Sequence, residues 1–305
     1  MGTYFLRRLR LALVTVIGVS IIVFVATRLS GDVVLLLLPQ DATQAEIARF
    51  RGELGLDRPY VVQYARFAWG VLHGDFGESI RYRQPAMELV LSRLPATLQL
   101  AFSSFVIATV AGVMLGVAAA RRRGSWLDLA ARMVSIGGQS MPNFWVGIMA
   151  ILVFAVSLGW LPTSGREGLS YMILPTLTLA LAPIASVLRI TRSAMLETLE
   201  SESVKFLRVK GAPEWLIVWK HALRNALIPV VALSGLQLGF LIGGTVIVET
   251  VFAWPGLGNL LVEAIATRDY PIVEAGVAVI SVFLILLNLA VDLLFGVIDP
   301  RVRFT

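Results

Sequence analysis

The chain of 305 residues contains no cysteine, only two histidines, His73 and His221, and few charged residues. The missing cysteines exclude disulfides, thiolate metal ligands and cysteine nucleophiles, and two histidines argue against a histidine-rich metal site. Only 15% of the residues are charged and 57% are hydrophobic, with a mean hydropathy of +0.80. Soluble domains carry about 25% charged and roughly 45–50% apolar residues, so the composition excludes a soluble globule.

Charged residues are absent from six stretches of 17 residues or more. A bilayer core of roughly 30 Å needs about 20 apolar residues in a helix, and the alternating pattern of a membrane β-barrel is missing. We therefore predict an all-α polytopic membrane protein with six transmembrane helices. They cover about 9–29, 95–121, 131–158, 170–193, 225–249 and 273–297. A cleaved signal peptide is disfavoured for the first, because its charge-free core is too long and no small-residue cleavage site follows.

Basic residues flank the predicted helices unequally. Sixteen of them lie before the first helix and after the second, fourth and sixth, whereas the short loops on the other side hold only Arg166 and Arg268. Because Lys and Arg beside short loops stay cytoplasmic, both termini are predicted to be cytoplasmic, including the tail 298–305. The net charge of +6 is therefore a signal of topology and not of nucleic-acid binding.

The long segment 30–93 is predicted to lie outside the cytoplasm and to contain short helices. Thr43 and Glu46 form a capping-box pattern, the helix that follows has a stop signal at Gly55, and Pro59 is suited to open another helix. These helices form either a belt on the membrane surface or part of a docking surface for an external partner.

No charged residue lies near the middle of a predicted span, which disfavours an ion-coupled carrier. The uncharged polar residues of the spans either line a solute path or hydrogen-bond one helix to another. The stretch 250–262 is too short to span the membrane, and its Trp-Pro-Gly turn predicts a gate loop with a short surface helix. The resulting pathway and gate candidates are Gln139, Asn143, Gln237, Trp254 and Asn288.

Glycines recur at four-residue spacing within two of the predicted helices. Gly235, Gly239 and Gly243 form one strip, and Gly112 and Gly116 form another. Such strips let helix backbones approach closely, either within this chain or at an interface with another subunit. Prolines in or beside the spans predict bent helices; they are Pro142, Pro175, Pro183 and Pro229.

The sequence contains no phosphate-binding loop, which requires Gly-Lys followed by Ser or Thr. None of the three lysines, Lys205, Lys210 and Lys220, follows a glycine. If this chain moves solute uphill, a separate subunit must hydrolyse ATP. We therefore predict a non-enzymatic chain with no catalytic residue, no metal site and no cofactor of its own.

The longest cytoplasmic connection, within residues 189–224, predicts two helices separated by a turn. Helix formers end at Gly211, which suits a helix C-terminus, and Pro213 suits the first turn of a second helix. Trp215 and Trp219 belong to an amphipathic stripe that predicts a second helix lying on the membrane surface. The segment is either a basic loop that fixes topology or a docking element for a cytoplasmic partner.

This segment resembles the EAA loop of permeases in bacterial binding-protein-dependent ABC importers, in the variant of the dipeptide/oligopeptide/nickel group. Residues 208–211 and 221–229 carry the likeness, although Lys205-Phe206-Leu207 replaces Glu-Ala-Ala and Arg224 replaces a proline. The likeness continues along the chain in Gly74-Asp75-Phe76-Gly77, Leu94-Pro95-Ala96-Thr97-Leu98, Arg123-Gly124-Ser125-Trp126-Leu127-Asp128, Pro142-Asn143-Phe144-Trp145, the run 248–258, Arg268-Asp269-Tyr270-Pro271 and Asp299-Pro300-Arg301.

The resemblance implies a type I ABC importer permease fold, with its core at 94–296 and its coupling loop at 197–224. It implies the B-type permease of a peptide importer in the bacterial inner membrane, with nickel chelates, glutathione or haem as alternative solutes. The implied partners are a C-type permease, two ATP-binding subunits that use ATP and Mg or a fused ATPase, and an external binding protein. The implied ATPase-coupling residues are Glu202, Ser203, Lys205, Phe206, Leu207, Arg208, Lys210 and Gly211.

Overall fold

The computed structural model describes residues 2–29, 34, 38, 42–53 and 55–298, so the predicted tail after residue 298 lies outside the described part. The described residues form helices, with a single isolated β-bridge between Glu78 and Pro85. They divide into two compact units. The first unit comprises mainly residues 1–95 and 259–286, and the second mainly 96–258 and 287–303.

Four helices in the described part are long and apolar enough to span a membrane. They are α5 (Ala86–Arg121), α8 (Leu169–Leu199), the continuous helix Glu214–Val251, and the part Tyr270–Val291 of α13 (Tyr270–Ile298). The first helix, α1 (Gly2–Leu29), contains a shorter apolar helix at Val14–Leu29. Together with one broken pair, the structure thus shows four to five candidate spans.

The sequence predicts one helix over 131–158, but the structure has a sharp break there. Helix α6 (Trp126–Ser140) is bent by 108° from α7 (Asn143–Ala150) and its continuation η1 (Ile151–Ser157). Pro142 cannot donate a helical hydrogen bond, and it forces the preceding Met141 into an extended conformation with ψ 125°. The predicted kink at this proline is therefore a complete interruption of the helix.

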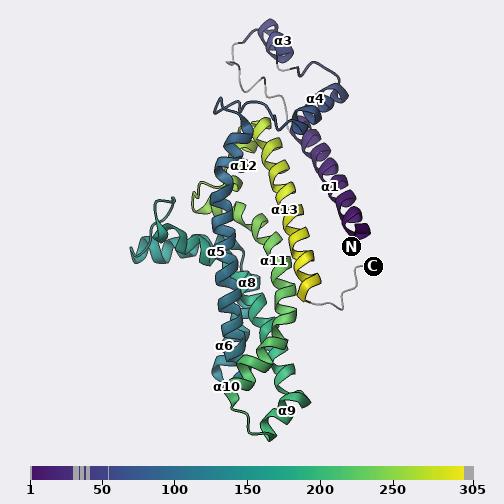
Figure 1. Ribbon diagram of the computed structural model, residues 1–305. Coiled ribbons are helices and arrows are strands. Elements are labelled where there is room, and N and C mark those ends of the chain that lie inside the picture. Colours follow the sequence, from purple (N-terminus) through teal and green to yellow (C-terminus); the bar gives the residue numbers. More distant parts are fainter. Residues whose placement is uncertain (1, 30–33, 35–37, 39–41, 54, 299–305) are drawn as a thin grey trace. The chain divides into compact units, whose positions relative to one another are not determined.

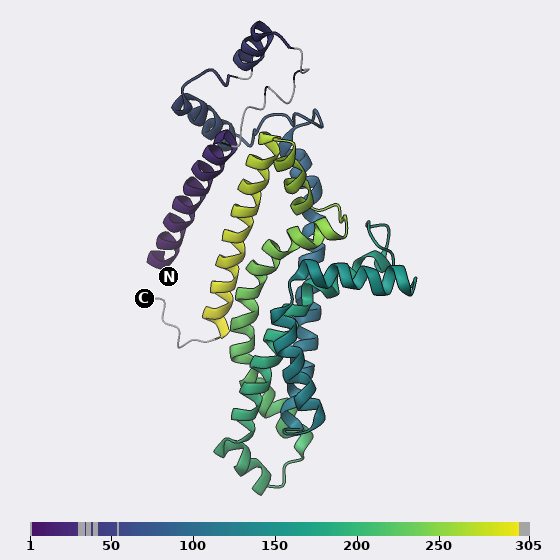
Figure 2. The same cartoon turned by 180° about the vertical axis from the view of Figure 1, so that it is seen from behind.

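Helix α8 is the centre of the second unit and packs against both α6 and α11 (Leu223–Val251) (Figures 1 and 2). Two glycines of α5 let that helix approach α8 closely. A Cβ at Gly112 would lie 2.6 Å from Val187 Cβ of α8, and one at Gly116 would lie 2.6 Å from Thr191 Cβ of α8. For this pair of glycines, the structure shows packing within the chain. Pro175 and Pro183 both lie inside α8.

The first unit contains short helices in the segment that the sequence places outside. The capping box before α3 (Gln44–Glu53) is confirmed: the Thr43 amide donates to Glu46 Oε2 at 2.8 Å, and the Glu46 amide donates to Thr43 Oγ1 at 3.3 Å. Gly55 follows with φ +67°, and Pro59 precedes α4 (Tyr60–Leu72).

The same segment also makes tertiary contacts within the first unit. The Ser79 hydroxyl donates to Asp269 at 2.5 Å, just before α13, and the Tyr64 and Phe24 rings pack edge to face at 5.4 Å. A segment held by such contacts is a folded part of the unit and not a free linker.

Candidate functional site

A short helix, α9 (Glu202–Val209), forms the centre of the segment that the sequence predicts to couple with an ATPase (Figure 1). It follows directly on α8, with Ser201 in the extended conformation of an N-cap. It ends at Val209 with Lys210 as the C-cap residue, and Gly211 then adopts φ +78°, a left-handed conformation that glycine tolerates best. The predicted helix boundary at Gly211 is confirmed.

Helix α9 is held to the rest of the second unit by the side chains of Val204 and Arg208. Val204 is only 1% exposed, and α9 contacts α8 and η2 (Ile217–Ala222). After the turn, Arg208 Nε lies 2.7 Å from Glu214 Oε1. These contacts fix the orientation of α9, and its anchoring residue Val204 is not among the predicted coupling residues.

The remaining surface of α9 is open and partly apolar. Phe206 is 58% exposed and Val209 is 86% exposed, and Lys210 Nζ lies 4.4 Å from the centre of the Phe206 ring. Of the eight predicted coupling residues, Leu207 is half-buried and the others are exposed. A small apolar surface with a charged rim is suited to a protein partner. Val209 is part of this apolar surface because residues three apart, such as Phe206 and Val209, lie on the same face of a helix.

The second predicted helix is not a separate helix. From Glu214, α10 (Glu214–Leu216) continues through η2 into α11 as one helix that ends at Val251. No glycine or proline lies between Glu214 and Pro229 to interrupt it, and Arg224 stands in this stretch. The amphipathic stripe is therefore the first part of a candidate span, with Ile217 and Val218 buried on its inner side.

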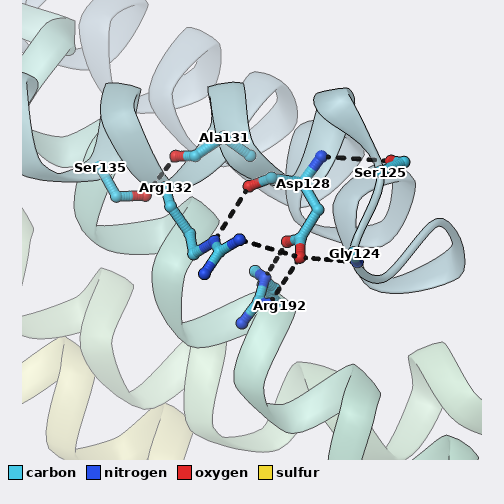
Figure 3. A network of polar contacts seen from close by, with 7 residues as sticks. All are labelled: Gly124, Ser125, Asp128, Ala131, Arg132, Ser135 and Arg192. Atoms are coloured by element: carbon cyan, nitrogen blue, oxygen red, sulfur yellow. Dashed lines mark hydrogen bonds and ion pairs between the residues drawn. The ribbon is translucent and has the colours of Figure 1, made fainter.

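A buried carboxylate joins α6 to α8 (Figure 3). Asp128 is 1% exposed, and it accepts hydrogen bonds from Arg192 Nε at 2.5 Å and from Arg192 Nη2 at 3.0 Å. The Gly124 amide donates to Asp128 Oδ2 at 3.1 Å, and Ser125 Oγ accepts from the Asp128 amide at 3.4 Å. A charge removed from water needs such partners, so this network fixes the entry of α6 against α8.

Asp128 lies in the run Arg123-Gly124-Ser125-Trp126-Leu127-Asp128 that resembles the permease family, but it is not among the predicted site residues. The signal was present, because Ser125 and Asp128 have the spacing of a capping box. Arg123 in the same turn pairs with Glu200, the residue that follows α8. The connection before α6 and the end of α8 are thus tied together next to α9.

The five pathway candidates do not form one cluster. Asn143 and Gln237 line the same cavity of about 350 Å³ in the second unit. The Gln139 amide instead donates to Ser135 on its own helix at 3.0 Å, and Asn288 is exposed on α13. Trp254 is fully buried. The structure therefore brings together two of the five.

Trp254 anchors the predicted gate loop instead of lining an opening. Its indole Nε1 donates to the Ala96 carbonyl at 3.0 Å. Nearby, the buried Glu249 accepts from the Thr97 hydroxyl at 2.6 Å, and Thr97 Oγ1 accepts from the Leu257 amide at 2.8 Å. The loop is thereby fastened to the start of the second unit's part of α5. The predicted short helix after it is α12 (Leu257–Ala266).

The glycines of α11 differ from those of α5. Within the described part of the chain, a Cβ at Gly239 or Gly243 would have no heavy atom within 4 Å. These two glycines therefore do not pack within the chain as Gly112 and Gly116 do, and the alternative of an interface with another subunit stays a prediction for them.

Long apolar helices, a bent helix pair and a short helix between two candidate spans define a polytopic helical membrane protein. Residues 112–304 match the family "Binding-protein-dependent transport system inner membrane component", and residues 1–101 match the N-terminal part of such membrane components. The chain belongs to this family, the permease subunits of ABC importers.

Several relatives extend over the full chain. It is 42% identical over 305 residues to the glutathione transport system permease protein GsiC of Salmonella paratyphi A, with 100% of both chains covered. It is 38% identical over 333 residues to the dipeptide transport system permease protein DppB of Escherichia coli K12, with 98% of both covered.

Solved structures of ABC transporters share the fold. The inward-facing MetNI methionine ABC transporter in its CY5 native crystal form has a TM-score of 0.55 and 21% identity, covering 70% of this chain and 97% of that one. An amino acid ABC transporter crystallised with histidines has a TM-score of 0.53 and 15% identity, covering 70% and 94%. The fold is therefore that of ABC importer permeases.

Proposed function

We propose that this permease carries short peptides into a bacterial cell as the B-type subunit of an ATP-driven importer. The observation that carries the proposal is the sequence similarity to a glutathione permease and a dipeptide permease, with 42% and 38% identical residues over nearly the whole chain. We further propose six spans, with α1 as the first and the bent pair α6–α7 as the third. The unequal distribution of basic residues supports cytoplasmic termini in the inner membrane.

The proposed complex contains a second, C-type permease, two ATP-binding subunits and an external binding protein. Helix α9 seats in a groove of one ATPase, with Phe206 and Val209 as the apolar contact. The exposed coupling residues surround this contact. ATP and Mg bind to the ATPase subunits, and closure of the ATPase pair moves α9. Because α9 continues from α8 and leads into α11, its movement favours one of two packings of the spans.

Glutathione is the second candidate solute, and the 42% identity with GsiC favours it. It shares peptide amides and carboxylates with a dipeptide, so the two solutes demand similar chemistry from a permease. The external binding protein decides between them, since it captures the solute first.

The test is reconstitution of the chain with its C-type permease, ATPases and binding protein in proteoliposomes. We expect ATP-dependent uptake of a labelled dipeptide or of glutathione, together with ATPase activity that rises when the loaded binding protein is added. Uptake by this chain alone under an ion gradient would identify a stand-alone carrier instead. If the chain assembles with an ATPase whose activity does not change with any solute, and no uptake occurs, the chain is a non-transporting membrane scaffold for that ATPase.

A further inference from the structure

The cavity that contains Asn143 and Gln237 combines apolar walls with a few polar groups. Three helices line it: α7 contributes Asn143, α8 contributes Ser186, and α11 contributes Gln237. Leucines, an alanine, a proline and Phe240 form the rest of the wall, and none of the lining residues is ionisable. Ligand sites of roughly 300–1,000 Å³ have this composition, and the volume of about 350 Å³ falls in that range.

The two amides in the cavity have unused hydrogen-bonding capacity. In the described part of the chain, the side chains of Asn143 and Gln237 have no hydrogen-bond partner, whereas the Ser186 hydroxyl donates to the Ala182 carbonyl at 3.1 Å. Each carboxamide offers one acceptor and two N–H donors. Polar groups removed from water are normally hydrogen-bonded, so two half-buried amides without partners in one cavity are available to bond an occupant of that cavity.

A proline and a glycine also shape the backbone around the cavity. Pro183 has no N–H, so the carbonyl of Leu179 does not receive the ordinary helical hydrogen bond, and both residues line the cavity. Gly244 keeps the space open: a methyl group there would lie 3.2 Å from Leu179 Cδ1 and 3.7 Å from Asn143 Nδ2.

We propose that this cavity is a solute-binding site on the translocation path, where Asn143 and Gln237 pair with the main-chain amide of a short peptide. A carboxamide matches both the C=O and the N–H of a peptide bond. Because no charge lines the cavity, the site recognises the peptide backbone and does not select among charged side chains. This inference rests on the proposed function and assigns its solute contacts.

The test compares the complete importer with a double variant, Asn143→Leu and Gln237→Leu, using a labelled dialanine peptide and loaded binding protein. We expect the maximal uptake rate to fall about tenfold, which corresponds to about 1.4 kcal/mol. The concentration of loaded binding protein at half-maximal rate should not change, since that protein docks elsewhere. The conservative pair Asn143→Gln and Gln237→Asn should keep the rate within about twofold, because the amides remain.

The control is Gln99→Leu, which removes an exposed amide of α5 that accepts from Arg166 outside the cavity. It should take up the peptide at the wild-type rate. Wild-type rates in the leucine double variant would overturn the inference and leave the proposed function intact. Loss of the C-type permease from the purified double variant would also overturn it, because the amides would then be subunit contacts. If the wild-type importer takes up no peptide, the proposed function fails first.

Discussion

Two buried carboxylates, Asp128 and Glu249, each hold neighbouring segments of the chain together. Asp128 is ion-paired to Arg192 and joins two helices, whereas Glu249 accepts a hydrogen bond from Thr97 under the loop that Trp254 anchors. Neither lies near the middle of a predicted span. Both therefore act by holding backbone segments in place, and their replacement should be measured as stability before it is measured as transport.

For Asp128→Asn we expect a loss of stability of about 1.5–3 kcal/mol, since hydrogen bonds to charged groups are worth this much and Arg192 would lose its counter-charge. The measurement is the thermal unfolding midpoint of the purified importer in detergent. Glu197→Gln is the matched control, because it removes an exposed carboxylate from the same helix as Arg192 and should change stability by less than about 0.5 kcal/mol. Equal midpoints for the two variants would contradict a structural role for the Asp128 network.

The capping box of α3 makes a prediction about pH. Hydrogen bonds from the Thr43 amide and then the Thr43 hydroxyl lower the pKa of Glu46 below its ordinary 4.5. Since the folded pKa is depressed, its stabilisation is present above pH 4.5 and is lost as the pH falls through the folded value. Amide exchange in α3, corrected for intrinsic rates, should therefore accelerate on acidification. In Glu46→Gln this acceleration should be absent, and an unchanged pH response in that variant would refute the assignment.

At the scale of helices, local patterns predicted most boundaries. The capping box at Thr43, the helix before Gly211 and the disturbance at Pro142 follow from signals within a few residues. The burial of individual side chains could not be predicted from these local patterns. A tryptophan beside a turn has the same sequence pattern whether it lines a gate or, like Trp254, is buried and hydrogen-bonded to Ala96. Likewise, only the structure distinguishes Asn143 and Gln237, which share a cavity, from Gln139, which bonds to its own helix.

The turn after α9 predicts how ATP hydrolysis and transport are linked. In Gly211→Val a β-branched side chain would occupy φ +78°, which costs roughly 1–2 kcal/mol. No atom lies within 4 Å of the new Cβ, so the strain is in the backbone and should reorient α9 without disturbing the spans. We expect solute-stimulated ATPase activity to fall severalfold while the complex is recovered normally. Gly211→Asn is the control, because asparagine tolerates this conformation; normal coupling in the valine variant would exclude the proposed docking.

Close helix packing predicts a contrast between two glycines. Gly116→Leu should destabilise the chain by about 1–3 kcal/mol or prevent folding, because its Cβ would clash with Thr191 of α8. Gly239→Leu should leave the unfolding midpoint unchanged, since its Cβ meets open space in the described part of the chain. The measurement is the thermal midpoint of each variant purified alone. A destabilised Gly239 variant would show that this glycine also packs internally.

The whole molecule makes a prediction about the source of energy. The spans carry no charged residue near their middle, the cavity that we assign to solute has no ionisable lining, and the sequence has no phosphate loop of its own. An ion gradient needs a titratable or ion-binding group along the path, whereas a mechanical input needs only a contact such as α9. Peptide uptake in proteoliposomes should therefore stay within about twofold when ionophores collapse the proton and sodium gradients. Uptake should vanish when the partner ATPases are inactivated. Uptake that survives ATPase inactivation but stops when the ion gradients collapse would show that transport is ion-coupled and not driven by ATP.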